Sequence, residues 1–412
     1  MYDRAASNRL LYTLFITQSL FAASNIAVFA LVAIVAVRLA HTDSVAGLAS
    51  STQTFSQALA AFPVALVMGR FGRRLGLSLG YLLAALGGLV GIIAILQGIF
   101  PLLLVGAVLI GMGRASGEQA RFAAGEMFPE GERARMIGRL VFAGTIGAVA
   151  GPALVAPSGR LMESLGLNPD IGPWVGMVVF CSLAALLTFA LLRPDPMTIA
   201  RIIGDEQKKN EPEQPARPLS ALFLLPKVQL GVAAALISQT VMVVLMVMTP
   251  LYMHHHHHHA ANISLVISMH TLGMFGLSAV TGYLIDRFGR IPMLFVGALI
   301  LIGSALLAPV STNEYVLAVA LFLLGLGWNF GYVAGSSLLA DALQGEERAR
   351  VQGVNDSLVF LAAGFGSLAS GPLFASGGYA AVSAAGLVLT LTLVGLIFWL
   401  GRPSMERKVE TV

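Results

Sequence analysis

Long stretches without a charged residue dominate this chain of 412 residues. A helix needs about 20 apolar residues to cross a bilayer, and ten stretches reach that length. They are Leu10–Val37, Ser44–Gly69, Leu75–Gly113, Leu140–Gly159, Ile171–Leu192, Val228–Met253, Ala260–Ile285, Ile291–Asn313, Tyr315–Ala340 and Ser357–Gly401. Charged residues make up only 11% of the chain, about half the share of a typical soluble domain. The stretches lack the alternation of membrane β-strands, so an all-α integral membrane protein is predicted.

Two of the stretches, Leu75–Gly113 and Ser357–Gly401, are about twice as long as one span requires. Turn-forming residues divide them, near Gly98 and Pro101 in the first and at residues 377–378 in the second. The chain is therefore predicted to form twelve transmembrane helices. The first stretch is too long for the apolar core of a cleavable signal peptide, so we expect it to be retained as the first span.

The basic residues are distributed unevenly. If both termini are cytoplasmic, 21 of the 25 lysines and arginines lie inside. Arg38 and Arg160 lie outside, and Arg114 and Arg121 lie within a span. Such an excess orients membrane helices, and it accounts for the net charge of +4 without a nucleic-acid partner. We expect a monomer in the inner membrane of the cell, with both termini cytoplasmic and with the lipid bilayer and a small-molecule substrate as its partners.

The sequence is internally repeated. Arg70-Phe-Gly-Arg73 recurs as Arg287-Phe-Gly-Arg290 at an offset of 217 residues, and Glu-Arg-Ala-Arg recurs at an offset of 215. The polar segment between the copies has the composition of a solvated linker. We therefore predict a six-helix half over residues 1–192, a cytoplasmic linker over 193–227 and a second six-helix half over 228–412. Repeated halves with a binding site between them are typical of secondary transporters.

The turn between spans 8 and 9 resembles motif A of the major facilitator superfamily (MFS). Its residues are Gly282, Asp286, Arg287, Gly289 and Arg290. In the first half Arg70 and Arg73 match the arginines, but Gly69 stands where the acid would be. The resemblance implies a cytoplasmic latch, in which the glycine lets helices approach, the acid faces the positive end of span 5 and the arginines pair with loop acids. Without its acid, the first-half side is expected to be weaker. The alternative is that these arginines only orient the helices.

Gly147, Gly151 and Pro152 in span 5 resemble motif C, a signature of the proton-driven exporters of this superfamily. Glycines four positions apart let a helix pack tightly, and a proline inside a helix favours a bend. The pattern also fits ordinary small-residue packing. Gly106 departs from the exporters, because it stands where their motif B carries an arginine. The resemblance covers essentially the whole chain and implies the MFS fold, two six-helix repeats around a central cavity.

Four charged residues lie within the predicted spans, where a buried charge is costly and usually functional. Arg114, Glu118 and Arg121 follow one face of span 4. They either brace the inner gate as an ion-paired cluster, or Arg114 holds an anionic group of the substrate. Asp356 lies about one turn into span 11 with no basic residue in the run that follows, which suits proton coupling, and Glu118 is a second candidate. Alternatively, Asp356 stabilises the N-terminus of its helix.

Uncharged polar and aromatic residues within the spans are candidates for the lining of the substrate cavity. They are Gln18 and Asn25 in span 1, Gln239 in span 7, and Trp328 and Asn329 in span 10. Such residues also join neighbouring helices by hydrogen bonds, so each has a structural alternative.

Six consecutive histidines follow span 7 on the predicted outer side. They are His254, His255, His256, His257, His258 and His259, and His270 lies about three turns into span 8. Because the run joins two spans directly, we interpret it as a natural feature and not as a purification tag. Imidazole binds divalent metals and titrates at about pH 6.5. A metal-capture site, a pH-sensitive outer gate and a polar loop without a specific role are all compatible with the run.

These features favour a transporter and not an enzyme. The chain has no nucleotide-binding Gly-x-x-x-x-Gly-Lys motif, so a proton gradient is expected to drive transport without a cofactor. The leading hypothesis is proton-coupled efflux of a small amphipathic organic compound by alternating access. Uptake of an anionic metabolite or vitamin is the second, a metal or metal-chelate carrier that uses the histidines is the third, and a non-transporting sensor is the fourth.

Overall fold

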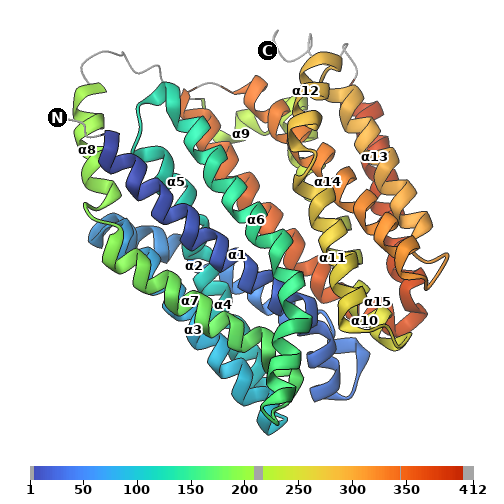
Figure 1. Ribbon diagram of the computed structural model, residues 1–412. Coiled ribbons are helices and arrows are strands. Elements are labelled where there is room, and N and C mark those ends of the chain that lie inside the picture. The colour runs from blue at the N-terminus through green and yellow to red at the C-terminus, as the bar shows by residue number, and fades with distance from the viewer. Residues whose placement is uncertain (1–3, 208–216, 344, 402–412) are drawn as a thin grey trace. The chain divides into compact units, whose positions relative to one another are not determined.

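The computed structural model describes residues 4–207, 217–343 and 345–401, and within these ranges the chain forms helices and turns but no β-strand (Figure 1). The elements are α1 (Arg4–Ala40), η1 (Asp43–Val45), α2 (Leu48–Phe71), α3 (Arg73–Gln97), α4 (Phe100–Glu118), α5 (Ala120–Glu126), α6 (Glu130–Ser164), η2 (Pro169–Ile171), α7 (Gly172–Leu191), α8 (Pro196–Gln207), α9 (Leu219–Leu222), α10 (Pro226–His255), α11 (Ala260–Phe275), α12 (Ser278–Phe288), α13 (Arg290–Leu307), α14 (Glu314–Ala342) and α15 (Gly345–Leu400).

Eleven helical segments of the described chain are long and apolar enough to cross a membrane. The last of them contains two helices, because Gly377 and Gly378 have non-helical backbone angles and Gly378 has a φ of +63°. The predicted turn after α3 is also present, since Gly98 ends that helix with a φ of +71°. The prediction of twelve transmembrane helices in an all-α fold is therefore confirmed.

The chain forms two compact units. Unit 1 contains Met1–His41 and Leu48–Glu213, and unit 2 contains Thr42–Gly47 and Gln214–Val412. In unit 1, α1 packs on α6 and α7, α3 packs on α4 and α7, and α2 packs on α4. A continuous cluster of buried apolar side chains, with Tyr81 and Trp174 among the largest, fills this unit.

Unit 2 repeats this pattern with its own helices. α10 packs on α14 and α15, α13 packs on the same two helices, and α11 packs on α14. The 42–47 segment, which links α1 to α2 in the chain, packs on α15 of this unit. The Ser367 hydroxyl donates a hydrogen bond of 2.9 Å to the carbonyl of Gly47, and a Cβ atom at Gly371 would overlap the carbonyl oxygen of Ser44.

Close helix contacts recur at matching places of the two units. A Cβ atom at Gly111 of α4 would overlap the carbonyl oxygen of Gln53 on α2, and one at Gly325 of α14 would overlap that of His270 on α11. Only glycine lets the two backbones approach this closely, as is common where helices pack in lipid. The repeat that the sequence indicates therefore extends to its helix–helix contacts.

Candidate functional site

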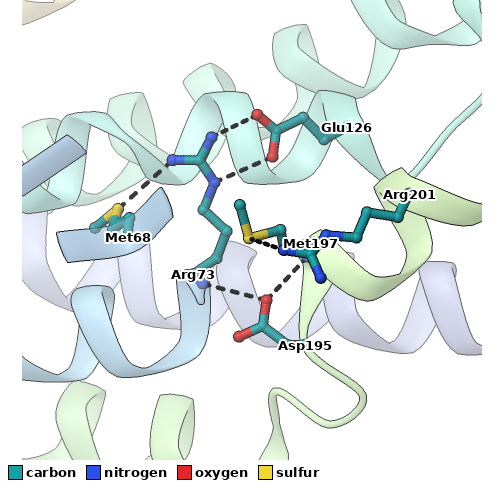
Figure 2. Close-up of polar contacts among 6 residues, drawn as sticks. All are labelled: Met68, Arg73, Glu126, Asp195, Met197 and Arg201. Atoms are coloured by element: carbon teal, nitrogen blue, oxygen red, sulfur yellow. Dashed lines mark hydrogen bonds and ion pairs between the residues drawn. The ribbon is translucent and has the colours of Figure 1, made fainter. Parts of the chain in front are cut away.

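In unit 1, the Arg-Phe-Gly-Arg turn joins α2 to α3, and Arg73 is the first residue of α3 (Figure 2). Its guanidinium donates two hydrogen bonds to the carboxylate of Glu126 on α5, from Nε to Oε2 at 3.1 Å and from Nη2 to Oε1 at 2.5 Å. This two-bond geometry is among the strongest ion pairs that side chains form. The Arg73 side chain is only 14% exposed, so the pair is partly shielded from water.

A second acid reaches the same turn from the segment after α7. Asp195 accepts hydrogen bonds from the backbone N–H groups of Arg73 at 3.2 Å and Arg74 at 3.0 Å. It also accepts one from the N–H of Met197 at 2.9 Å, within the first turn of α8. One carboxylate therefore stabilises the N-termini of two helices. The sequence prediction assigned no role to Asp195.

Unit 2 has a matching turn between α12 and α13. Arg290 contacts Asp286 at 2.9 Å and Asp341 at 3.0 Å, but these acids are 75% and 50% exposed. Arg287 is exposed and donates to the Tyr283 hydroxyl at 2.7 Å. In unit 1 the matching Arg70 is also exposed, and its guanidinium lies over the ring of Phe71. The predicted contact of Asp286 with the end of span 5 stays a prediction.

Another repeated ion pair escaped the sequence prediction. Arg4 pairs with Glu132 at 2.9 Å in unit 1, and Arg217 pairs with Glu347 at 2.8 Å in unit 2. The two acids are the first residues of the repeated Glu-Arg-Ala-Arg segments. Hydrogen bonding to Glu347 raises the pKa of Arg217. The pair in unit 1 links the first turn of α1 to the first turn of α6, and the pair in unit 2 links the segment before α9 to the first turn of α15.

A cavity of about 480 Å³ opens beside the Arg73–Glu126 pair. Its lining comes from the start of α3 and from α5, α6 and α8, and consists of Arg73, Phe122, Gly125, Glu126, Ile137, Met197, Ala200 and Arg201. The volume lies within the range of about 300–1,000 Å³ that is usual for small-molecule sites. The cavity lies at the loop end of unit 1, away from the mid-span residues that the sequence proposes for substrate.

The charged residues of span 4 are arranged less regularly than predicted. α4 ends at Glu118 and α5 begins at Ala120, so the expected single helical face is interrupted at Gln119. Glu118 and Arg121 are 4.0 Å apart and both are partly exposed, while Arg114 lies deeper. No hydrogen bond from the Arg114 side chain forms within the described chain; its interaction with Glu118 is electrostatic.

Gly106 could not carry the arginine of motif B in this packing. A Cβ atom there would lie 2.9 Å from the carbonyl oxygen of Gly87 on α3. The close contact between α3 and α4 therefore requires a small residue at position 106, where the exporters have an arginine.

Asp356 is partly buried near the start of α15, and the residue takes part in a polar or electrostatic contact. Its predicted role in proton coupling stays a prediction. Its neighbour Asn355 is 2% exposed, and the Oδ1 atom of Asn355 has no hydrogen-bond partner in the described chain.

Two of the predicted cavity residues hold helices together. Asn329 of α14 donates to the carbonyl of Met274 at 2.6 Å and to the Ser278 hydroxyl at 2.9 Å. These acceptors flank the break between α11 and α12. Asn25 of α1 accepts a hydrogen bond from Gln53 of α2 at 3.3 Å. Gln18 is different, because its buried Oε1 has no hydrogen-bond partner within the described residues.

Trp328 and Gln239 form an aromatic and amide cluster in unit 2, which we call the Trp328 cluster together with Tyr332 and Phe275. The indole N–H of Trp328 donates to Gln239 Oε1 at 2.8 Å. Trp328 stacks on Tyr332, with ring centres 5.0 Å apart, and meets Phe275 edge-on at 5.9 Å. Gln239, Tyr332 and Phe275 are all half-buried, so the edge of this cluster is accessible.

The motif C-like glycines pack α6 against α1. A Cβ atom at Gly147 would overlap the carbonyl oxygen of Ser19, and one at Gly151 would lie 2.5 Å from that of Ala23. α6 continues as one helix through Pro152. Gly282 behaves differently, because no atom of the described chain lies within 4 Å of the Cβ position there. Gly282 therefore makes no close helix contact within the described part of unit 2, and the approach expected there stays a prediction.

The histidine run begins at the end of α10, and its imidazole rings contact different partners. His255 lies 3.6 Å from Asp43, and His258 lies 3.6 Å from Glu314 and 2.7 Å from the carbonyl of Thr312. His270 is buried and contacts the carbonyl of Leu321 at 2.9 Å. Among the residues that the structure describes, no three metal-binding side chains come together in one group.

Comparison with known proteins agrees with the repeated architecture. The family model described as Major Facilitator Superfamily matches residues 14–260 and 230–411. The uncharacterized MFS-type transporter YdeG of Bacillus subtilis is 35% identical over 403 residues, which cover 96% of this chain and 93% of that protein. The riboflavin transporter RfnT of Brucella anthropi is 30% identical over 386 residues, which cover 93% of each protein.

The fold is also similar to the crystal structure of a D-xylose–proton symporter. The TM-score is 0.72 at 16% identity, over 93% of this chain and 96% of that one. The family follows from three findings. They are the twelve membrane-spanning helices, the repeated turns with matching ion pairs, and the relatives that align over nearly the full length. This chain belongs to the Major Facilitator Superfamily.

Proposed function

We propose that this chain is a secondary active transporter that exports a small amphipathic organic solute in exchange for protons, by alternating access. The turns at 70–73 and 287–290 then face the cytoplasm, in keeping with the excess of basic residues near them.

One observation carries the proposal. Arg114 in α4 and Trp328 in α14 occupy equivalent positions in the two repeats. Each follows a Gly-x-Gly segment, 111–113 in the first repeat and 325–327 in the second. The glycines make matching contacts, since Cβ atoms at Gly113 and Gly327 would lie 2.7 Å and 3.0 Å from the carbonyl oxygens of glycines on α3 and α13, respectively. Transporters built from repeats bind their substrates with residues of both repeats.

The chemistry of the two positions favours an amphipathic solute. The Trp328 cluster offers stacked rings next to an amide, which suits a flat apolar ring with polar groups at its edge. Arg114 is a cation whose guanidinium forms no hydrogen bond in the described chain, so an anionic or carbonyl group could bind there. Proton-coupled export is further supported by the likeness of Gly147, Gly151 and Pro152 to motif C.

Uptake of a vitamin-like metabolite is a second candidate. It is favoured by the relative that is named a riboflavin transporter, because a flavin has the flat polar-edged ring that the Trp328 cluster would suit. The two candidates differ in direction and not in the residues that would contact the solute.

Purified protein in liposomes tests both candidates. Vesicles in which one orientation has been selected are given a pH gradient, and the movement of ethidium or riboflavin is followed by fluorescence. Proton-driven movement away from the cytoplasmic face supports export, and movement toward it supports uptake. If neither probe responds to the pH gradient, and a protonophore changes nothing, proton-coupled transport of such solutes is wrong.

Replacing Trp328 with alanine is expected to weaken binding of the transported probe by roughly tenfold, because aromatic stacking contributes about 0.5–1.5 kcal/mol beyond buried area. The measurement is the probe concentration at half-maximal transport. Trp399 provides the control, because it is 58% exposed on α15. The W399A variant should match the unmodified protein. Equal effects of W328A and W399A would contradict a role of Trp328 in binding.

Replacing Asp356 with asparagine is expected to stop accumulation against a gradient and to leave solute exchange intact, because an amide cannot bind and release a proton. Counterflow of the same probe across the membrane measures the exchange. If D356N still accumulates the probe, the proton passes elsewhere, and E118Q is the next variant to measure.

A further inference from the structure

The two Arg-Phe-Gly-Arg turns have the same backbone but different acids. Gly72 has φ and ψ of 94° and 161°, and Gly289 has 94° and 158°. In unit 2 the residue before the turn is Asp286, which pairs with Arg290. In unit 1 that residue is Gly69, and no atom of the described chain lies within 4 Å of its Cβ position. The place of the acid is therefore vacant in one of two otherwise equivalent turns.

Asp195 brings a carboxylate to the turn that lacks one. Its Oδ1 accepts from the N–H of Arg73 and its Oδ2 from that of Arg74, so both oxygens bind the first residues of α3. Figure 2 shows Asp195 next to Arg73 and Met197. The fit is close, because a Cβ atom at Gly72 would overlap Oδ2 of Asp195 and lie 2.9 Å from its Cγ. At Gly289 the nearest atom to a Cβ would be Cδ of Pro292, at 3.7 Å.

The helix that follows fixes Asp195 in place. α8 buries Ile199 and Ile203, which are 6% and 4% exposed, in the apolar core of unit 1. The N–H of Met197 donates to the same Asp195 carboxylate. Asp195 is thus held by its own helix as well as by the turn, in a segment that would otherwise only connect the two halves.

We propose that Asp195 takes over, in unit 1, the role that the acid of the turn has in unit 2. The start of the linker then belongs to the cytoplasmic latch of the transporter, and Asp195 is a positioning residue that acts through Arg73 and Arg74. The inference rests on the proposed transport function for its activity test, and it also has a test that needs no substrate.

The decisive comparison restores the missing acid in the absence of Asp195. Asp195→Asn is expected to reduce the initial rate of probe transport by roughly tenfold, since a neutral amide holds the backbone N–H groups at the start of α3 less strongly than a carboxylate does. Gly69→Asp has open space at its Cβ and should leave the rate nearly unchanged. The double variant G69D/D195N should recover a measurable part of the lost rate, because an acid at 69 pairs with Arg73 at the i, i+4 spacing.

A matched pair of glycine variants checks the contact itself. Gly72→Ala and Gly289→Ala impose the same backbone strain, because both positions have a φ of +94°. Only Gly72→Ala displaces the Asp195 carboxylate. Gly72→Ala should therefore slow transport more than Gly289→Ala does, and G69D should relieve the difference.

The thermal unfolding midpoint of the purified full-length protein gives the same comparison without a substrate. D195N should lower the midpoint, and G69D/D195N should recover part of the loss. The unmodified protein could fail to transport ethidium and riboflavin while the midpoint of G69D/D195N still recovers. That pair of results would reject the proposed function and support this inference. An unaffected D195N overturns it. A D195N defect that G69D does not repair also overturns it, because Asp195 would then serve only as a helix cap.

Discussion

Leucine in place of Gly111 is expected to prevent the chain from accumulating as folded protein. The first atom of the new side chain would overlap the carbonyl oxygen of Gln53, and it would lie 2.8 Å from Cβ of Ser56. α2 and α4 would have to move apart over their whole contact, and even modest overpacking of a core costs about 1–3 kcal/mol. Size-exclusion chromatography of a fluorescent fusion measures the result, as loss of the monodisperse peak.

Two further variants make this expectation specific. Gly325→Leu should fail in the same way, because its Cβ would overlap the carbonyl oxygen of His270 at the matching contact of unit 2. Gly176→Leu should express normally, since Gly176 lies in α7 and no described atom is within 4 Å of its Cβ position. Normal folding of G111L, or failure of G176L, would contradict the proposed importance of these backbone contacts.

Replacing Arg73 with alanine is expected to lower the unfolding midpoint by about 5 °C. The variant removes two charge-assisted hydrogen bonds from a shielded pair, which together contribute on the order of 1.5–3 kcal/mol. For a unit of this size, 1 kcal/mol shifts the midpoint by roughly 2–4 °C. Differential scanning fluorimetry of the purified protein measures the shift. R73K should be intermediate, because an ammonium group cannot donate two parallel bonds to Glu126.

Arg290 supplies the matched control for Arg73. Its two acids, Asp286 and Asp341, are at least half exposed, and exposed ion pairs contribute only about 0–1 kcal/mol. R290A should therefore change the midpoint by about 2 °C or less. A shift as large as that of R73A would show that the exposure of the acids does not set the strength of these pairs.

The fold could be predicted from the sequence because a bilayer restricts what a chain can form. Spanning segments must satisfy their own backbone hydrogen bonds, so the length of each uncharged stretch determines its helix content. The turns at Gly98 and at Gly377 and Gly378 were predictable because turn-forming residues stand near the middle of stretches that are about twice as long as one span. Helix packing inside each unit depends on backbone contacts, such as that between Gly111 and Gln53, which no local pattern indicates.

The site residues were harder to predict because their roles depend on distant partners. Asn329 is a residue type that often lines a cavity, but its amide donates to the carbonyl of Met274 at the break between α11 and α12. Asp195 and Arg73 lie more than a hundred residues apart in the chain. The sequence contains one signal for Asp195. Gly69 stands where motif A carries its acid, which indicates that the acid either comes from elsewhere in the chain or is dispensable.

The 42–47 segment has a consequence for how this chain can be divided. A gene cut at the linker would encode two polypeptides, and the first would retain six residues that pack on α15 of the second. Expressed alone, residues 214–412 would lack the carbonyl of Gly47 as acceptor for Ser367 and would leave the surface at Gly371 uncovered. The two halves share repeated motifs but are not interchangeable modules, and co-expression of both fragments is the arrangement in which the second should fold.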